Sequence, residues 1–350
     1  MKVAVVGKFT TEEMGYHILY TLRKIGYDAY GIEFGPKVHA DRNFMRMFRT
    51  YRRKLFEIGI NTIRTVRKVL LKHILNHISE LKEIDLIIST YDYFTYEEIR
   101  EIKKTTKATI VLWFPDAVSN FGRGYFMTAG YDFMFFKDPY VVRYLREFYG
   151  FKNVFYLPEA FNPDLHKVPK YDPKDEESYG CDISVVANLH SFRVPILEKL
   201  VSTGKYSIKI YGSPPPYYVN TSNQLLGIYT GRYLANEEKA KAWRYAKISL
   251  NTLHPGEIES VNVRVFEITG AGGFLLTPYR KCLEDLFVIG EEIEVYYSLN
   301  DMIDKIDHYL KNSEKREKIR EKGQKRALME HTYEQRLRTM LEIIEKGGHE

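Results

Sequence analysis

The sequence predicts an α/β protein made of two lobes, each built on a doubly wound parallel sheet with helices around it. Short apolar runs alternate with segments of helical period along nearly the whole chain, which is the pattern of parallel α/β folds. The length of 350 residues exceeds one compact core, at roughly 100–200 residues per domain. Proline-punctuated polar sequence at 157–178 separates two such series. We therefore expect domains at 1–160 and 161–331, and a helix at 332–350 that packs back toward the first domain.

The first domain contains six apolar runs of strand length. Buried parallel strands are covered on both faces, so they appear as nearly continuous apolar runs. The expected strands are 3–6, 29–34, 85–89, 109–114, 131–136 and 154–157. Segments of helical period fill the gaps, as at 14–25 and 96–103. This order predicts a doubly wound first lobe.

A second series of the same kind follows the polar break. The expected strands are 182–187, 207–211, 227–230, 248–251 and 274–277, with helices at 193–201 and 237–245 between them. After residue 298 the pattern is helical, at 302–310, 314–327 and 333–344. Open parallel sheets bind ligands beyond the carboxyl ends of their strands. Two such edges facing each other predict a ligand-binding cleft between the lobes.

Composition excludes several classes of protein. Hydrophobic residues make up 44% and charged residues 28% of the chain, and no apolar run approaches the ~20 residues of a membrane span. The opening sequence MKVAVVG has the pattern of a first strand and lacks that of a secretory signal. Cys181 and Cys282 form no metal-binding spacing. We expect a soluble cytoplasmic protein without a structural metal.

Positive charge is concentrated in one segment. Residues 42–72 contain ten Lys or Arg against one acid, Glu57, so this segment carries 10 − 1 = +9, and the remainder carries 6 − 9 = −3. A general basic surface is therefore absent, and we expect no nucleic-acid partner. Apolar residues recur at helical spacing in 42–73. This amphipathic segment either packs on its own sheet or makes peripheral contact with an anionic membrane surface.

Residues 248–277 carry the most informative pattern, a strand, a loop, a helix, three glycines and a strand. Ser260 or Asn262 is expected to cap the helix, whose first free amides would then lie at the carboxyl edge of the sheet. Such amides form a site for a diphosphate. Glu259 in the loop and Glu267 in the helix stand eight residues apart. We expect Glu267 to accept hydrogen bonds from ribose hydroxyls, and Glu259 and His254 to contact a sugar.

This pattern resembles a known family of sugar-transferring enzymes. The run NVRVFE at 262–267, followed by GAGGFLL at 270–276, is similar to the signature of CgeB-like (spore-protein) glycosyltransferases, relatives of the group 1 glycosyltransferases. Further pieces occur in the family's order, namely CDISVVAN at 181–188 with Arg193, IYG at 210–212, and HTY at 331–333 with Arg336. The resemblance covers the second lobe only.

The resemblance implies a GT-B fold, with two Rossmann-like domains that face each other across a cleft. It places Glu267 on the ribose and Glu259 near the sugar of a nucleotide-sugar donor. Arg193 occupies the region where related enzymes place cations against the donor diphosphate. Asn188 departs from the pattern, since group 1 relatives often carry an arginine there. The positive charge would then come from Arg193 and Arg264.

The region around IYG at 210–212 adds Gly212 to the donor-contacting candidates, beside Asn188, Asn262 and His254.

The expected chemistry needs no metal or cofactor, because the nucleotide sugar is itself the substrate. Negative charge grows on the leaving diphosphate, and guanidinium groups and helix amides can stabilise it. No D-x-D pair occurs in the sequence, which favours metal-independent transfer to an acceptor that the sequence does not identify. The spacing of Glu259 and Glu267 resembles that of retaining enzymes. If the enzyme inverts, Asp116 or His17 is the candidate base.

Two other functions fit similar lobes. A non-catalytic protein that binds a nucleotide or nucleotide sugar would keep the same donor contacts. A dinucleotide-dependent oxidoreductase would need a G-x-G-x-x-G turn, and the opening VVGKFT lacks it.

Overall fold

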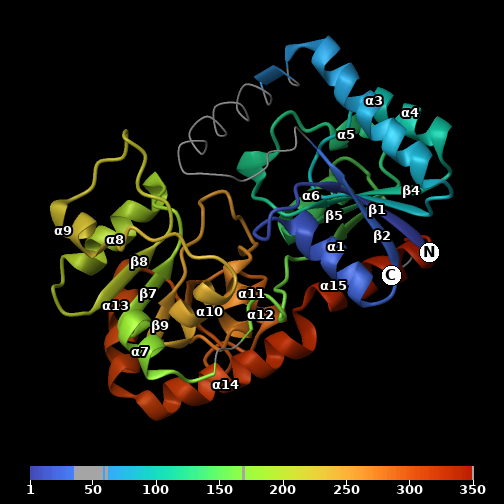
Figure 1. Cartoon of the computed structure of the whole chain (residues 1–350). Coiled ribbons are helices and arrows are strands. Elements are labelled where there is room, and N and C mark those ends of the chain that lie inside the picture. Colours follow the sequence, from blue (N-terminus) through green and yellow to red (C-terminus); the bar gives the residue numbers. More distant parts are fainter. Residues whose placement is uncertain (35–57, 60–61, 168–169, 349–350) are drawn as a thin grey trace.

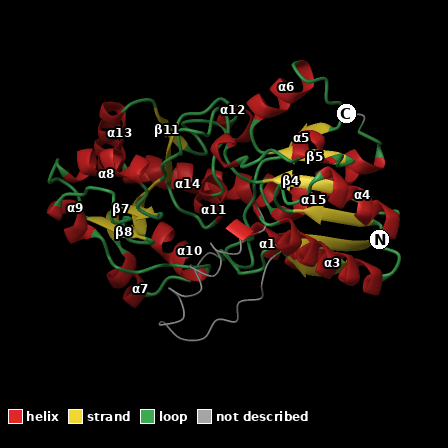
Figure 2. Ribbon diagram, turned by 90° about the horizontal axis from the view of Figure 1, so that it is seen from above, coloured by secondary structure: helices red, strands yellow, loops and turns green. Residues whose placement is uncertain are grey.

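The computed structural model describes residues 1–34, 58–59, 62–167 and 170–348. Two lobes lie side by side, each with a parallel sheet between layers of helices (Figure 1). Seen from above, the two sheets occupy opposite ends of the molecule (Figure 2). The predicted fold class of two doubly wound α/β sheets is confirmed.

The sheet of the first lobe has six parallel strands in the order β2-β1-β3-β4-β5-β6. Their bounds are β1 (Lys2–Gly7), β2 (Asp28–Glu33), β3 (Leu86–Ser89), β4 (Thr109–Phe114), β5 (Phe133–Phe136) and β6 (Val154–Tyr156). Alternation along β1 places Val3 and Val5 in one core and Ala4 and Val6 in the core on the other face. Both faces of the sheet are therefore buried, as the apolar runs predict.

Helices of the first lobe connect these strands. They are α1 (Met14–Lys24), α3 (Arg64–Leu81), α4 (Tyr96–Thr105), α5 (Phe126–Ala129) and α6 (Pro139–Glu147). A capping box of Thr95 and Glu98 begins α4. Asp138 begins α6, where its side chain accepts from the amide of Tyr140 and Pro139 fills the first position. Helix α6 therefore starts directly beyond the carboxyl end of β5.

The sheet of the second lobe has five parallel strands in the order β11-β10-β9-β7-β8. Their bounds are β7 (Cys181–Val186), β8 (Ile208–Tyr211), β9 (Ala246–Leu250), β10 (Leu275–Pro278) and β11 (Glu294–Tyr296). The strand expected at 227–230 is wrong, because helix α9 (Asn223–Ile228) occupies its first half. Only an isolated bridge joins Tyr229 to Ile210. Strand β11 was not expected, because it is only three residues long.

The remaining helices follow β6 in the chain, and the last of them packs on the first lobe. They are α7 (Pro173–Tyr179), α8 (Val194–Val201), α10 (Glu237–Arg244), α11 (Arg264–Gly270), α12 (Leu283–Leu286), α13 (Leu299–Lys311), α14 (Ser313–Glu330) and α15 (Tyr333–Glu345). Helix α14 runs along the second lobe, and α15 returns to the first (Figure 1). There Tyr333 and Leu337 share a core with Val3 and Ile18. The chain thus crosses between the lobes twice.

No helix in the described part of the chain is both long and apolar enough to cross a membrane.

Candidate functional site

Two arginines meet the carboxyl edge of the second sheet. Arg193 follows β7, and its Nε donates to Thr252 Oγ1 at 2.9 Å while its Nη1 donates to the carbonyl of Asn188 at 2.8 Å. Arg264, the first residue of α11, donates from Nε to the carbonyl of Val186 at 3.1 Å. The structure thus brings together two of the residues that the sequence singled out.

Neither arginine of this pair forms an ion pair with a described residue, and each side chain is hydrogen-bonded to neutral oxygens. Arg193 is 4% exposed, and burial together with the charge of Arg264 lowers its pKa to about 9. The pKa of His190 is lowered by burial and by the same two arginines. Buried charges are normally paired. The arrangement therefore favours an anionic ligand.

Close backbone packing fixes the loops beside the pair. Asn188 Oδ1 accepts from the amide of Ser213 at 3.0 Å, which ties the end of β7 to the end of β8. Gly212 has φ 138°, and a Cβ there would lie 2.4 Å from the carbonyl oxygen of Ala187. Only glycine fits this position. Asn188 and Gly212, both predicted donor contacts, thus shape the loops next to Arg193.

The loop after β9 carries His254 and Asn262. His254 Nδ1 accepts from the amide of Gly256 at 2.9 Å, and its ring packs edge-on against Phe192 at 4.9 Å. Asn262 Nδ2 donates to the carbonyl of Thr252 at 3.0 Å, while its buried Oδ1 has no partner among the described residues. Buried polar atoms are normally hydrogen-bonded. Asn262 Oδ1 is thus available to a ligand or water.

The expected cap of α11 is wrong. The N-cap position is Val263, and no side chain caps this helix. Ser260 instead donates to Glu257 Oε2 at 2.5 Å, and Asn262 donates to the carbonyl of Thr252, just after β9. The polar side chains that could cap the helix are therefore used to fix the loop before it.

Glu267 is buried at the junction of the lobes. Its Oε1 accepts from Lys239 Nζ at 3.1 Å and lies 3.3 Å from His166 Nε2, without hydrogen-bond geometry to that ring. Burial would raise the pKa of Glu267, but Lys239, His166 and Arg264 outweigh it and lower the pKa to about 2. Lys239 also binds Glu12 of the first lobe at 2.8 Å. Glu267 Oε2 accepts no hydrogen bond from the described residues, so half of the carboxylate is free.

Glu259 is held by the first lobe. Arg143 of α6 donates to its two carboxylate oxygens at 2.7 and 2.8 Å. This bidentate contact is the main cause of the lowered pKa of Glu259. The predicted sugar contact therefore also serves as one half of an ion pair between the lobes.

Asp116 belongs to a second group of charged residues, which lies where the lobes meet. It follows β4, and Asp116 Oδ1 accepts from the amide of Ala117. Next to it, Lys137 Nζ lies 2.9 Å from Glu257 Oε1 and 3.3 Å from Glu159 Oε2. Burial raises the pKa of Glu159 to about 7, and the charges of Glu257 and Asp116 act in the same direction. This group joins both lobes at one point.

Sequence analysis missed Lys137, Glu159 and Glu257. One signal was present for Lys137, because it directly follows a predicted strand at the edge where ligands bind. The two glutamates lie in loops, 22 and 120 residues from Lys137, and no local pattern marks them.

His17, the other candidate base, is buried in α1. Its ring stacks on Tyr333 at 5.0 Å and on His166 at 6.1 Å. Burial and the neighbouring His166 lower the pKa of His17 to about 3. A ring that weakly basic accepts a proton poorly, which argues against His17 as a general base.

Metal ligands do not gather in the described residues: no group of three His, Cys, Asp or Glu side chains is placed to hold an ion.

Two facing Rossmann-like sheets with a C-terminal helix that returns to the first define the GT-B fold, and solved structures share it over the whole chain. Sucrose-phosphate synthase from Thermosynechococcus elongatus is 12% identical, with a TM-score of 0.68 over 99% of both chains. Anabaena Alr3699/HepE in complex with UDP is also 12% identical, with a TM-score of 0.68 over 99% of this chain and 100% of that one. An α,α-trehalose-phosphate synthase (UDP-forming) from Burkholderia vietnamiensis is 13% identical, with a TM-score of 0.61 over 99% and 100%.

In sequence, residues 193–342 match a family model described as glycosyl transferase-like. This segment begins at Arg193 and includes Arg264 and Glu267. A comparison with curated proteins gave no match.

Proposed function

We propose that this protein is a glycosyltransferase that moves a sugar from a nucleotide-sugar donor to an acceptor. The observation that carries the proposal is the pair of Arg193, which is buried, and Arg264, which is partly buried; neither forms an ion pair with a described residue. A diphosphate supplies two negative groups for two such cations. The glycosyl transferase-like match over 193–342 and the UDP bound by Alr3699/HepE support the same ligand class. We further propose the CgeB-like subtype, from the motif at 262–276.

The arginine pair would act on the leaving group. As the bond between the sugar and the diphosphate breaks, negative charge grows on the phosphate oxygens. Guanidinium groups already fixed by Thr252, Asn188 and Val186 can stabilise that charge without rearranging. We therefore propose transfer without a metal ion or a cofactor.

The nucleoside would lie beside the same edge. Gly212 allows the end of β8 to lie against the backbone of Ala187 and Asn188, which fixes the loop next to Arg193. Glu267 Oε2 is the free acceptor for a ribose hydroxyl, since Oε1 is held by Lys239. Asn262 Oδ1 is a further unpaired acceptor beside the diphosphate site. His254 is our proposal for a sugar contact.

Retention of configuration is our proposal for the stereochemistry, based on the spacing of Glu259 and Glu267. In that case the leaving phosphate takes the proton of the acceptor. Asp116 is the proposed base for the alternative of inversion, because it is partly exposed and follows a strand of the first lobe.

A thermal-shift panel tests the proposal. UDP-, GDP-, ADP- and dTDP-sugars are each added to the wild-type chain and to Glu267→Ala, and release of the nucleoside diphosphate is followed with the stabilising donor. One donor should raise the melting temperature of the wild type and raise it less in Glu267→Ala. Equal stabilisation of both proteins would contradict the ribose assignment. Binding without any release of nucleoside diphosphate or transfer would instead support the non-catalytic binding protein.

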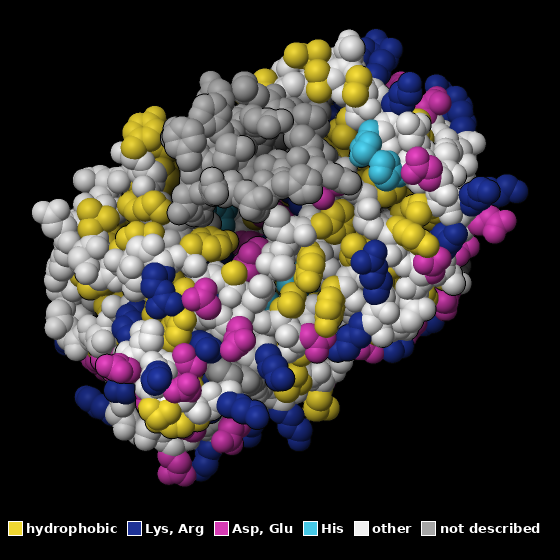
Figure 3. Space-filling model, in the orientation of Figure 1, with side chains coloured by type: hydrophobic (Ala, Val, Ile, Leu, Met, Phe, Trp, Pro, Cys, Tyr) yellow, Lys and Arg dark blue, Asp and Glu magenta, His cyan; other side chains and the backbone are white. Residues whose placement is uncertain are grey.

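Helix α3 supports a second proposal, peripheral contact with an anionic membrane on its cytoplasmic face. Arg64, Lys68 and Lys72 follow each other at four-residue spacing on its exposed side, and none forms an ion pair with a described residue. Ile63 is 52% and Val69 is 67% exposed nearby. Basic and hydrophobic side chains share the upper end of α3 (Figure 3). This combination is typical of surfaces that bind anionic lipid. The remainder of the basic segment, 42–57, lies outside the described residues.

Sedimentation with vesicles tests this surface. Each cation near an anionic membrane contributes about 1 kcal/mol, so replacing Arg64, Lys68 and Lys72 with Gln should weaken binding to phosphatidylserine vesicles by about 100-fold. A matched triple change of Lys315, Lys318 and Lys325 on α14 is the control and should bind like the wild type. Equal binding by all three proteins would rule out the membrane surface.

A further inference from the structure

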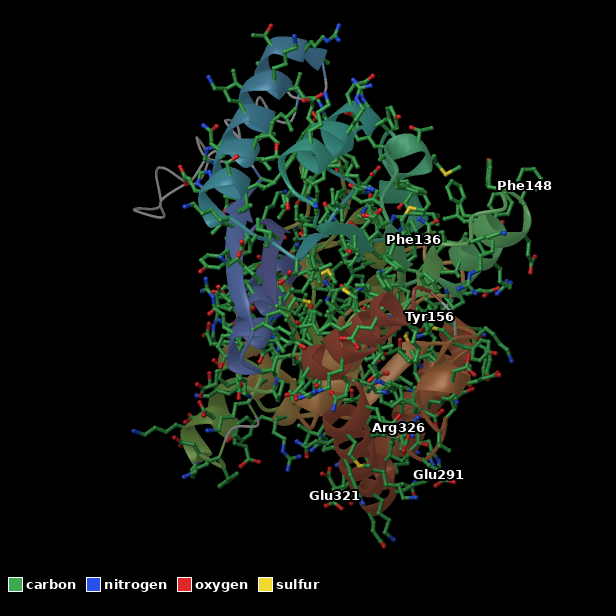
Figure 4. All side chains as sticks on the ribbon, turned by 90° about the vertical axis from the view of Figure 1, so that its right-hand side faces the viewer. Phe136, Phe148, Tyr156, Glu291, Glu321 and Arg326 are labelled. Carbon is green, nitrogen blue, oxygen red and sulfur yellow. The ribbon has the colours of Figure 1, made fainter. Side chains whose placement is uncertain are left out.

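One short segment of the first lobe contacts the loop 254–262 of the second lobe. Residues 137–143 run from the end of β5 into the first turns of α6. The loop 254–262 lies between β9 and α11. Lys137, Asp138 and Arg143 all contact that loop. Tyr156 of β6 lies at the junction of the lobes beside this segment, whereas Phe148 projects from the far end of α6 (Figure 4).

The contacts cover the centre of the loop. Lys137 Nζ binds Glu257 Oε1 at 2.9 Å, and both side chains are almost completely buried. Asp138 Oδ2 accepts from the amides of Ile258 and Glu259 at 3.1 and 3.3 Å. Arg143 binds both carboxylate oxygens of Glu259. Three side chains of one lobe thus fix three consecutive residues of the other.

The fixed loop is connected to the arginine pair by a chain of hydrogen bonds. Ser260 Oγ donates to Glu257 Oε2, and Asn262 Nδ2 donates to the carbonyl of Thr252. Thr252 Oγ1 in turn accepts from Arg193 Nε. Arg264 begins the helix two residues after Asn262. A shift of the loop would therefore move both Arg193 and Arg264.

We propose that Lys137, Asp138 and Arg143 form a cross-lobe clamp, which positions the loop 254–262 and so preorganises Arg193 and Arg264 for the donor diphosphate. This inference rests on the proposed function. The clamp residues are positioning residues, because they act through the loop and touch no substrate. Contact between the two lobes and binding of the donor are then coupled, since the same loop takes part in both.

The exposed end of the clamp gives the sharpest test, because Arg143 is half-exposed and its replacement leaves the buried contact of Lys137 in place. In Arg143→Glu the ion pair becomes a repulsion. The double variant Arg143→Glu with Glu259→Arg restores a pair of opposite charge. Lys322→Glu is the matched control, because it reverses an exposed ion pair with Glu291, away from the loop. Figure 4 shows Glu291 on the second lobe, far from α6.

Affinity for UDP, GDP and ADP is measured by titration calorimetry, with melting temperature as the readout of folding. The clamp predicts that Arg143→Glu weakens binding of the preferred nucleotide by about tenfold, that the charge swap restores it, and that Lys322→Glu binds like the wild type. With donor sugar, KM should rise while kcat changes little, because the clamp acts on binding geometry.

Two results would overturn the clamp alone. Unchanged affinity in Arg143→Glu would show that the loop does not depend on the contact. Failure of the charge swap to restore affinity would show that the ion pair of residues 143 and 259 does not position the loop. If the wild-type chain binds none of the nucleotides, the proposed function fails, and the clamp fails with it.

Discussion

Arg193 offers a prediction that separates function from stability. Its guanidinium is buried, and the pKa falls from 12.5 to about 9 because of burial and the charge of Arg264. This lowering of the pKa corresponds to a cost of about 5 kcal/mol in the free energy of folding, because the charged guanidinium is buried when no ligand is bound. Methionine has a similar stem without the charge. The two hydrogen bonds to Thr252 and Asn188 would be lost, at about 1.5 kcal/mol each.

Without a ligand, the cost of burying the charge exceeds the contribution of the two hydrogen bonds, so the neutral side chain of methionine is favoured. Arg193→Met should raise the free energy of unfolding by about 2 kcal/mol, and the melting temperature by about 4–8 °C for a lobe of this size. The pKa of Arg193 is depressed, so the penalty is complete below pH 9 and fades as the pH rises toward 12.5. The advantage of the variant should therefore shrink above pH 9.

Thermal unfolding with and without the nucleotide donor is the assay. The matched control is Arg320→Met, since Arg320 is equally buried but pairs with Glu317 at 3.0 Å and donates to the carbonyl of Ala246. Burial lowers the pKa of Arg320 only to about 10, so its smaller burial cost is offset by these contacts, and that variant should gain much less stability than Arg193→Met. The donor should stabilise the wild type and no longer stabilise Arg193→Met. A marked fall in the melting temperature of empty Arg193→Met would refute the claim that its charge is uncompensated.

Four further changes test other parts of the account. Gly212→Ala should destabilise the second lobe by about 2 kcal/mol and weaken donor binding, because its φ of 138° and the carbonyl of Ala187 exclude a Cβ; urea unfolding measures this. The lowered pKa of Glu267 means that the wild type loses stability as the pH falls from 4.5 toward 2. Glu267→Gln should lack this contribution, so its acid unfolding curve should be less steep over that range. The pKa of His166 is lowered to about 4, so His166→Asn should flatten the loss of melting temperature between pH 6.5 and 4; an unchanged slope would contradict its burial as a neutral ring. The pKa of Glu159 is raised to about 7, so Glu159→Gln should stabilise the protein at pH 8 and not at pH 4.5, in chemical unfolding at both pH values.

The architecture was predictable because buried parallel strands and their covering helices leave a periodic pattern in the sequence. Strand β4 occupies the predicted range, 109–114, and most other strands begin and end within two residues of prediction. The errors fall where the pattern is short. Tyr229 and its neighbours have the β-branched and aromatic character of a strand, but α9 extends to Ile228 and leaves room for one bridge.

The site was only partly predictable. Arg193 and Arg264 could be expected at one edge, because both follow or precede strands of the same sheet. The ion pair of Arg143 with Glu259 joins residues 116 positions apart and depends on how the lobes meet. The link of Lys239 to Glu12 and Glu267 has the same origin. Such contacts form only in the tertiary structure, so no spacing in the sequence indicates them.

A crystal structure with the stabilising nucleotide sugar tests the central claim most directly. The account predicts that the diphosphate oxygens lie within hydrogen-bond distance of the guanidinium groups of Arg193 and Arg264, with a ribose hydroxyl on Glu267. A nucleotide bound elsewhere, with both guanidinium groups still free of any anion, would contradict it.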